Sequence, residues 1–423
     1  MRWQQGLLAA GFLAAWVSSG GRVARAEEVP DCRRVGRANL VRCAAGASLS
    51  RRAAGAAIEA ADGRAMATEP WFPSAPSLGL TGARRTAAGE AAWNWSATLG
   101  VELGIAGERG ARRRAALGEK EAETKRADAL VRRIAVEAWR AYFELLSARE
   151  ARRVTQGLEA ASKRVWDAAN AAATRGAAPG VEADLAEAAY LRVVQRRIGA
   201  EHDERRAHGE LATLLGFAGP EAIAVEGALT PLAAAERARA GRARETPDAA
   251  AFEADARAFE ARAEAQRRSR VPNPTVSVFA ERDGFYENVL GLGLSLPLPL
   301  PEPIGRMHQG EITESEALAR RAKLLAAESR RRIQAELLAA LASYDAAHAS
   351  AALFTTERLG RAQTTIEHLA ADVETARISA RDAVILETPL FELLAEAVAA
   401  QRELCLASAA VVWAGGLDFE GAR

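Results

Sequence analysis

The sequence is poor in the residues that most often build catalytic or metal centres. Its 423 residues include only three cysteines, three methionines and five histidines. No two histidines have metal-ligand spacing near cysteine or carboxylate residues, and the neighbours Met307 and His308 are typical of a surface pair. Neither a nucleophile elbow nor a phosphate-binding glycine loop is present. We therefore expect no enzyme activity, no cofactor and no metal site.

The sequence also lacks a charge imbalance and a long apolar run. With 56 basic and 55 acidic residues the formal net charge is +1, so nothing in the whole molecule attracts nucleic acid and we expect no such partner. After the first residues no stretch of 18 or more apolar residues occurs. We therefore expect no membrane-spanning helix in the rest of the chain.

The first 26 residues have the form of an export signal. A basic Arg2 precedes an apolar stretch from Gly6 to Val17, and Ala24 and Ala26 flank Arg25 as a small-x-small cleavage site. About a dozen apolar residues are too few to span a bilayer. We predict a cleaved signal peptide over 1–26.

The next segment, 27–48, holds two of the three cysteines. Export to an oxidising compartment would permit a disulfide between Cys32 and Cys43, with Cys405 left single. The sequence leaves open whether this bridge forms. We expect a short periplasmic segment here.

An internal repeat organises the remainder of the chain. Segments 93–106 and 288–297 both alternate apolar and small residues, and flanking features recur after 191 to 200 residues. Each copy has a strand hairpin, a very long helix, a turn and a second long helix. We predict a first repeat over 49–230, a second over 231–416 and a tail at 417–423.

Helical spacing locates these elements. In the first repeat we predict a hairpin over 76–106, in which TGARRTAAGEAA forms the loop, and helices over 108–174 and 181–215. A 67-residue helix would be roughly 100 Å long. In the second repeat we predict a hairpin over 274–297 and helices over 305–375 and 381–414, after a weaker helical segment at 247–268.

The strands raise the question of what their apolar faces meet. A continuous apolar face opposite one of Gly, Ser, Thr and Asn fits a membrane β-barrel, with Trp93, Trp95, Phe285 and Tyr286 near the hairpin tips as an interfacial girdle. The alternative is a soluble hairpin packed on helices. The residues that we expect to face lipid are Leu99, Val101, Leu103, Leu290, Leu292 and Leu294.

Closure of such a barrel requires oligomerisation. Two hairpins supply four strands, and open sheet edges are not tolerated in hydrocarbon. A dimer would give eight strands with a filled interior, whereas a trimer would give twelve with room for a pore. The small inward-facing residues favour the trimer.

These features together resemble the TolC family of outer-membrane efflux proteins. The resemblance lies in the strand openings APSLGL and NPTVSV, the strand GLGLSLPL, the Ala-rich helices with Tyr142 and Tyr344, and the segments GAAPGVEADLAEAAYL and ARISARDAVILETPLFELL. It covers about residues 40 to 416. The LPLP run and the GAAPG turn are most similar to the cation-efflux (CzcC-like) branch.

The resemblance implies a mainly helical fold with membrane strands. Each protomer of a homotrimer would give four strands to a twelve-stranded outer-membrane barrel, continued by an α-helical tunnel in the periplasm. The implied partners are outer-membrane lipid, a periplasmic adaptor (membrane fusion) protein and an inner-membrane pump of the resistance-nodulation-division type. The implied function is the passive channel of a tripartite pump, with heavy-metal cations as a candidate cargo.

The helix-turn-helix tips are the candidate functional sites. The residues that we assign to gating at the tunnel mouth are Glu182, Asp184, Arg377, Arg381 and Asp382, and those that we assign to adaptor contact are Gly176, Ala177, Ala178, Pro179, Gly180, Ile378 and Ser379. The carboxylates could form an acidic ring that favours cations, or they could only cap their helices. Two departures from the family pattern are Ala376 in place of a tip glycine, and Pro389, which should kink its helix.

Two rival functions remain at this stage. The same duct could serve type I protein secretion or drug efflux, since a duct need not bind what passes through it. A periplasmic coiled-coil adaptor or structural protein would be a different class, but an adaptor usually has one helical hairpin flanked by β-rich segments. Here the hairpin-plus-helix pattern occurs twice.

Overall fold

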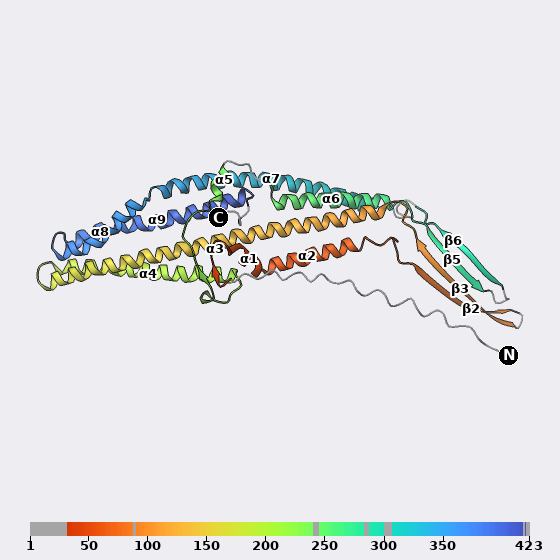
Figure 1. Cartoon of the computed structure of the whole chain (residues 1–423), viewed down its shortest axis with the longest axis horizontal. Helices are drawn as coiled ribbons and strands as arrows, with labels where there is room; N and C mark the ends of the chain where they lie inside the picture. Colours follow the sequence, from red (N-terminus) through yellow and green to blue (C-terminus); the bar gives the residue numbers. More distant parts are fainter. Residues whose placement is uncertain are drawn as a thin grey trace.

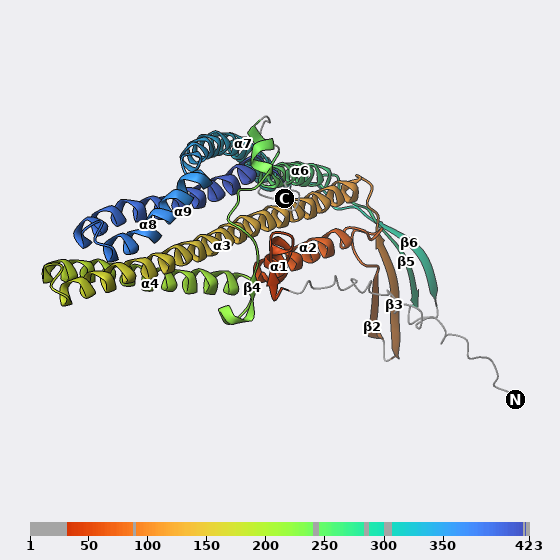
Figure 2. The same cartoon turned by 60° about the vertical axis from the view of Figure 1, so that its left-hand side comes forward.

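A computed structural model describes residues 32–87, 90–239, 245–282, 287–299, 307–417 and 419. The predicted signal peptide, Phe285 and Tyr286 lie outside these residues, as does most of the predicted tail. The described chain is strongly elongated, with a four-stranded sheet at one end and paired helices running to the other (Figure 1). Figure 2 shows that the turns α3–α4 and α8–α9 reach the same far end.

The helices account for most of the length. In chain order they are α1 (Leu40–Ala47), α2 (Leu49–Met66), α3 (Glu108–Thr174), α4 (Gly180–Leu214), the 3-10 turn η1 (Pro220–Ala222), α5 (Ala234–Arg239), α6 (Pro247–Arg268), α7 (Gln309–Ala352), α8 (Thr356–Glu374) and α9 (Ala380–Ala414). The predicted bounds of α3 are matched, and its 67 residues are roughly 100 Å long. Small residues permit close packing along it, because a Cβ at Gly118 would lie 3.0 Å from the Cβ of Ala258 on α6.

The predicted helix over 305–375 is interrupted. α7 ends at Ala352, α8 begins at Thr356, and the two are bent by 47°. The Thr355 hydroxyl accepts the Arg358 backbone N–H at 3.3 Å, and the Arg358 guanidinium donates to the Leu353 carbonyl at 2.7 Å. These contacts end one helix and start the next without Pro or Gly, so the spacing signals for a helix end were absent.

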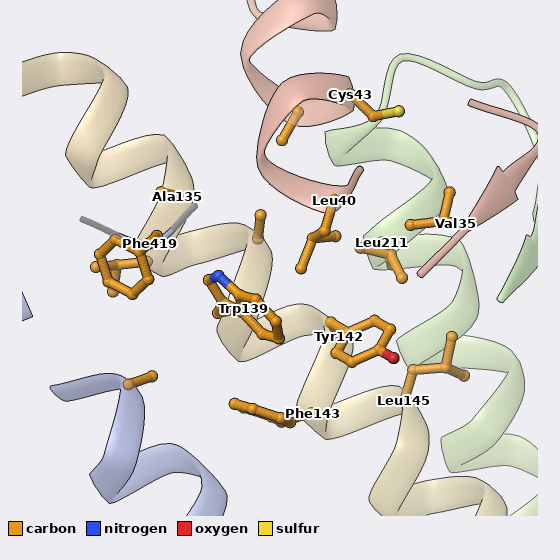
Figure 3. Close-up of a cluster of buried hydrophobic side chains, with 14 of the residues drawn as sticks. Val35, Leu40, Cys43, Ala135, Trp139, Tyr142, Phe143, Leu145, Leu211 and Phe419 are labelled. Carbon is orange, nitrogen blue, oxygen red and sulfur yellow. The ribbon is translucent and has the colours of Figure 1, made fainter. Parts of the chain in front are cut away.

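The main core lies near the middle of the molecule. Trp139, Tyr142 and Phe143 of α3 are buried there, with ring centroids of Trp139 and Tyr142 5.6 Å apart (Figure 3). The Tyr142 hydroxyl donates to the Glu226 carbonyl at 2.6 Å. This core joins helices of both predicted repeats, because Cys405 of α9 belongs to it.

The amino-terminal segment packs against this core and pairs with the chain between α4 and α5. Strand β1 (Arg34–Val35) pairs in parallel with β4 (Ala224–Val225), and a disulfide joins Cys32 to Cys43 with an S–S distance of 2.05 Å. Cys405 is a free, buried thiol. The segment thus links the start of the chain to the connection between the repeats.

The large sheet is an antiparallel array in the order β2–β3–β5–β6. Its strands are β2 (Ser77–Ala87), β3 (Glu90–Glu102), β5 (Thr275–Arg282) and β6 (Asn288–Ser295). Most of the loop predicted over TGARRTAAGEAA is instead paired strand, with Arg84 opposite Trp93 and Arg85 opposite Ala92. The prediction was wrong because the charged residues were taken for a turn, whereas they continue the alternation.

Candidate functional site

One face of the sheet is apolar across all four strands. The register places Leu99 beside Leu78 and Val278, and Val278 beside Leu292. Leu290, Leu292 and Leu294 are each at least 75% exposed. The residues of this apolar face are Leu78, Leu80, Ala97, Leu99, Val101, Val276, Val278, Ala280, Leu290, Leu292 and Leu294.

The opposite face carries mostly small and polar residues. Gly100 lies between Ser77 and Ser277, and Gly293 pairs with Ser277. The largest exception is Phe279, whose ring lies over Gly291: a Cβ added at Gly291 would be 2.4 Å from the ring. The absence of a side chain at Gly291 therefore lets the Phe279 ring lie against the sheet.

The apolar face has the height of a membrane crossing. Ten residues of chain separate Leu103, just beyond β3, from Trp93 near the tip, which is roughly 34 Å at 3.4 Å per residue. At a tilt of about 40° this spans roughly 26 Å, close to the apolar band of outer-membrane barrels. The sheet extends beyond the helices in Figures 1 and 2. The soluble alternative, a hairpin packed on helices, is therefore not what the described residues form.

The two helical tips have the same backbone geometry. Gly176 has φ 71°, and Ala376, at the equivalent place in the second tip, has φ 55°. The Ala177 N–H donates to the Ala172 carbonyl, and the Arg377 N–H donates to the Asp372 carbonyl, each at 2.9 Å. The second tip therefore keeps the left-handed turn without glycine, at the steric cost of a Cβ in that region.

The three predicted tip carboxylates differ in their hydrogen-bond contacts. The Ser379 hydroxyl accepts the Asp382 N–H at 3.1 Å and lies 2.8 Å from the Asp382 carboxylate, so this pair caps α9. Glu182 is in the first turn of α4, but its carboxylate accepts the Ala380 N–H of α9 at 3.2 Å. Asp184 is exposed. The structure thus brings Glu182 to the second tip.

The predicted tip arginines are both exposed. Arg377 Nη1 lies 3.5 Å from Asp372 Oδ1 at the end of α8, and its side chain is 76% exposed. Arg381 points to solvent in the first turn of α9. Within this protomer Arg377 is therefore engaged in a local ion pair.

The predicted adaptor-contacting residues lie at the surface above a small core that joins the two tips. Gly176, Ala177, Pro179 and Gly180 are exposed, and Ala178, Ile378 and Ser379 are partly buried. Beneath them Val165, Ala186 and Ala383 belong to one cluster that includes α3, α4, α8 and α9, with Ile378 packed against it. The two tips therefore form one surface.

A buried carboxylate between the hairpins was missed by the sequence reasoning. Glu387 of α9 is 3% exposed, and the Ser162 hydroxyl of α3 lies 3.5 Å from its Oε2. Burial raises the pKa of Glu387 to about 7, and Ser162 lowers it by less. Its position could have been found, because it continues the buried spacing of Ala380, Ala383 and Phe391 along α9.

A cavity of about 730 Å³ opens where α7 gives way to α8. Phe354, Leu158 and Leu394 contribute its apolar lining. The basic groups at this cavity are already engaged, since Arg149 pairs with Glu204 at 3.3 Å and Arg153 pairs with Glu150 at 2.5 Å. Both arginines of this cavity are therefore already paired within the protomer.

Two further observations bear on the class of protein. Across the described ranges, no group of three or more His, Cys, Asp or Glu residues could hold a metal ion. None of the described helices alone has the length and apolar composition of a membrane span; α7 and α8 meet that test only when taken as one bent pair.

Comparison with known proteins agrees with this geometry. The family model described as outer membrane efflux protein matches residues 42–217. No curated protein sequence matches the chain.

Solved structures share the fold over nearly the whole chain. A membrane protein from Pseudomonas aeruginosa has a TM-score of 0.71 at 18% identity, covering 92% of this chain and 91% of its own. The outer membrane protein VceC from Vibrio cholerae has a TM-score of 0.70 at 18% identity (90% and 96% covered), and CusC has 0.69 at 15% (90% and 92%).

The expected resemblance to outer-membrane efflux proteins is thus confirmed. The family model supplies it for residues 42–217, and the solved structures share the fold over 90% or more of the chain. The matched family and these neighbours are outer-membrane transport ducts and not enzymes, which agrees with the localisation and class expected from the sequence.

Proposed function

We propose that this chain is the outer-membrane channel of a tripartite efflux pump. Three copies would close their four-stranded sheets into a twelve-stranded barrel, and their helices would form the tunnel. An inner-membrane pump would deliver substrate through a periplasmic adaptor, and the channel would conduct it passively. Residues 49–230 and 231–416 would be the two repeats of this duct.

The strongest support is the exposed sheet with opposite faces of different character. Its apolar face, with Leu292 80% exposed, would be a liability in water, and lipid would cover it. Its outer strands β2 and β6 are open edges in one chain, which hydrocarbon does not tolerate. A closed trimer satisfies both requirements.

The tips support the remaining partners. In this proposal Gly176 to Gly180, Ile378 and Ser379 contact the adaptor, because they form one surface at the end farthest from the sheet. Glu182, Asp184 and Asp382 would face the tunnel mouth with Arg377 and Arg381. Within the protomer, Glu182 accepts the Ala380 N–H and Asp382 is hydrogen-bonded to the Ser379 cap of α9, so any gating would be added to a structural role.

For the cargo we propose heavy-metal cations driven by a pump of the resistance-nodulation-division type. The support is the LPLP run and the GAAPG turn, which resemble the cation-efflux branch. Drug efflux or type I secretion through the same duct is the alternative. Deletion of the chain in its host should sensitise cells to metal salts and not to drugs; sensitivity to drugs alone would favour the alternative.

The channel itself is tested by fractionation. The protein should be found in the outer membrane, and detergent extraction without heating should yield a species three times the mass of the mature protomer. Heating should reduce it to the protomer. A monomer in the periplasmic fraction would overturn the proposal.

A further inference from the structure

Glu387 is a carboxylic acid placed between two apolar clusters. On α9 it lies one turn after Ala383 and one turn before Phe391. Ala383 packs in the tip cluster with residues of α3, α4 and α8, and Phe391 packs in a second cluster with Leu158 of α3 and Ile366 of α8. Glu387 therefore interrupts an otherwise apolar seam between the hairpins α3–α4 and α8–α9.

The polar atoms of Glu387 are poorly satisfied. Its only hydrogen-bond partner among the described residues is the Ser162 hydroxyl, at the long distance of 3.5 Å, and Oε1 has none. A buried carboxylate of this kind is costly when ionised and far less so when protonated. The site therefore favours the bound proton.

Neighbouring charges do not compensate for the burial. On α3, Lys163 pairs with Asp167 at 2.9 Å and Glu159 pairs with Arg197 at 2.6 Å. Burial and the Ser162 hydroxyl are the two influences on the pKa of Glu387, and no charged group adds to them. Tyr190 of α4 stacks on Trp166 of α3, and Glu187, Arg192, Glu367 and His368 of the neighbouring helices are exposed.

The helix is also weakened beside this carboxylate. Pro389 lies inside α9 two residues further on and has no N–H to donate to the carbonyl of Ile385. α9 therefore lacks one backbone hydrogen bond in the turn that carries Glu387. Local separation from α3 costs less here than in an unbroken helix.

We propose that Glu387 is a proton-binding site that controls the packing of α9 on α3. With the proton bound, the two hairpins stay packed from the tip cluster to Phe391. When the proton leaves, the charged side chain draws this turn of α9 toward water and the seam opens locally. The packing claim stands on the fold of this chain, and its bearing on opening of the tunnel rests on the proposed function.

The direction of the pH dependence follows from where the proton is held. The packed state holds the proton up to a pH of about 7, whereas an exposed glutamate releases it near 4.3. Packing is therefore strongest below about pH 4 and weakens as the pH rises toward 7. The two pKa values differ by about 2.7, so the full change in the packed-to-open ratio is roughly 500-fold.

Amide hydrogen exchange on the detergent-extracted protein tests this proposal. Peptides covering 380–392 and 158–170 are compared between wild type and Glu387→Gln at the same pH, so that intrinsic exchange rates cancel. Wild type should lose protection between pH 5 and pH 8, by up to roughly 100-fold, and Glu387→Gln should stay protected at both. Glu392→Gln, at an exposed position of the same helix, should behave as wild type.

Two results would overturn the proposal. One is equal protection of the wild-type peptides at pH 5 and pH 8, a measurement that needs no variant to fold. The other is a Glu387→Gln or Glu387→Leu protein that keeps the wild-type pH dependence. A conductance series over the same pH range separates the packing claim from the channel claim. If amide exchange depends on pH but the protein forms no channel, Glu387 still controls the packing of α9 on α3, and the proposed channel function is rejected.

Discussion

The Glu182 carboxylate of α4 accepts a hydrogen bond from the backbone N–H of Ala380, the first residue of α9, with an O···N distance of 3.2 Å. The two residues are 198 positions apart, and each belongs to a different predicted repeat. Glu182 thus supplies a capping oxygen to the helix of the other tip. This contact makes the two tips one mechanical unit, with the small core of Val165, Ala186 and Ala383 beneath it.

Removal of this contact should loosen the second tip. Glu182→Ala leaves the Ala380 N–H without its partner, and loss of a capping acceptor costs about 1 kcal/mol. Amide exchange at 380–383 should therefore quicken roughly fivefold, whereas Asp184→Ala, an exposed carboxylate two residues further along the same helix, should have no effect. Equal effects of the two substitutions would show that charge, and not the hydrogen bond, matters.

The same carboxylates give a separate prediction about ion selectivity. If Glu182 and Asp382 face the tunnel mouth of a trimer, their replacement by Ala should reduce the preference for cations over anions in planar bilayers. Because alanine at position 182 also removes the oxygen that accepts the Ala380 N–H, Asp382→Asn serves as the comparison that removes a charge and leaves the Ser379 cap in place. Unchanged reversal potentials in every variant would leave helix capping as the whole role of these residues.

The apolar face of the sheet predicts the outcome of charge insertion. Leu292→Arg and Leu294→Arg should each disfavour membrane insertion by about 2 to 4 kcal/mol near the midplane. Ser295→Arg places the same charge on the opposite face of β6 and should be tolerated. In Western blots of outer-membrane fractions, the double variant that carries both Leu292→Arg and Leu294→Arg should be depleted, and the Ser295→Arg variant should be present. Normal levels of the double variant would contradict the assignment of lipid to this face.

The helices and sheet differ in how far the sequence could predict them. The bounds of α3 were predicted correctly because Ala and Leu recur at helical spacing and the Gly and Pro residues after 175 end the pattern. The break between α7 and α8 has no such signal, since side-chain contacts of Thr355 and Arg358 make it. Arg84 and Arg85 were assigned to a loop because charged residues are typical of turns, yet they lie in β2.

The candidate site likewise has features that local sequence predicts and features that only the fold shows. Sequence spacing correctly placed Asp382 at the start of α9, where capping depends on residues only three apart. The contact between Glu182 and Ala380 could not be predicted in this way, because it requires the two repeats to be packed side by side. Glu387 is intermediate, since its spacing assigns it to the buried face but only the fold shows that Ser162 is its sole partner among the described residues.

The small-residue face of the sheet leads to a last prediction, on Gly291 and Phe279. A Cβ at Gly291 would lie 2.4 Å from the Phe279 ring, closer than any ordinary contact, so Gly291→Val should force the ring off the sheet. In a closed barrel the displaced ring would project into the lumen, and single-channel conductance should fall.

Two matched variants separate this effect from a general loss of β-structure. Gly82→Val adds the same side chain to β2 on the apolar face of the sheet, where nothing lies within 4 Å, and should leave conductance unchanged. Phe279→Ala combined with Gly291→Val should restore conductance, because the added methyl groups then have the space that the ring had occupied. If the double variant remains as impaired as Gly291→Val alone, the ring is not the cause, and the added β-branched side chain itself must disturb the sheet.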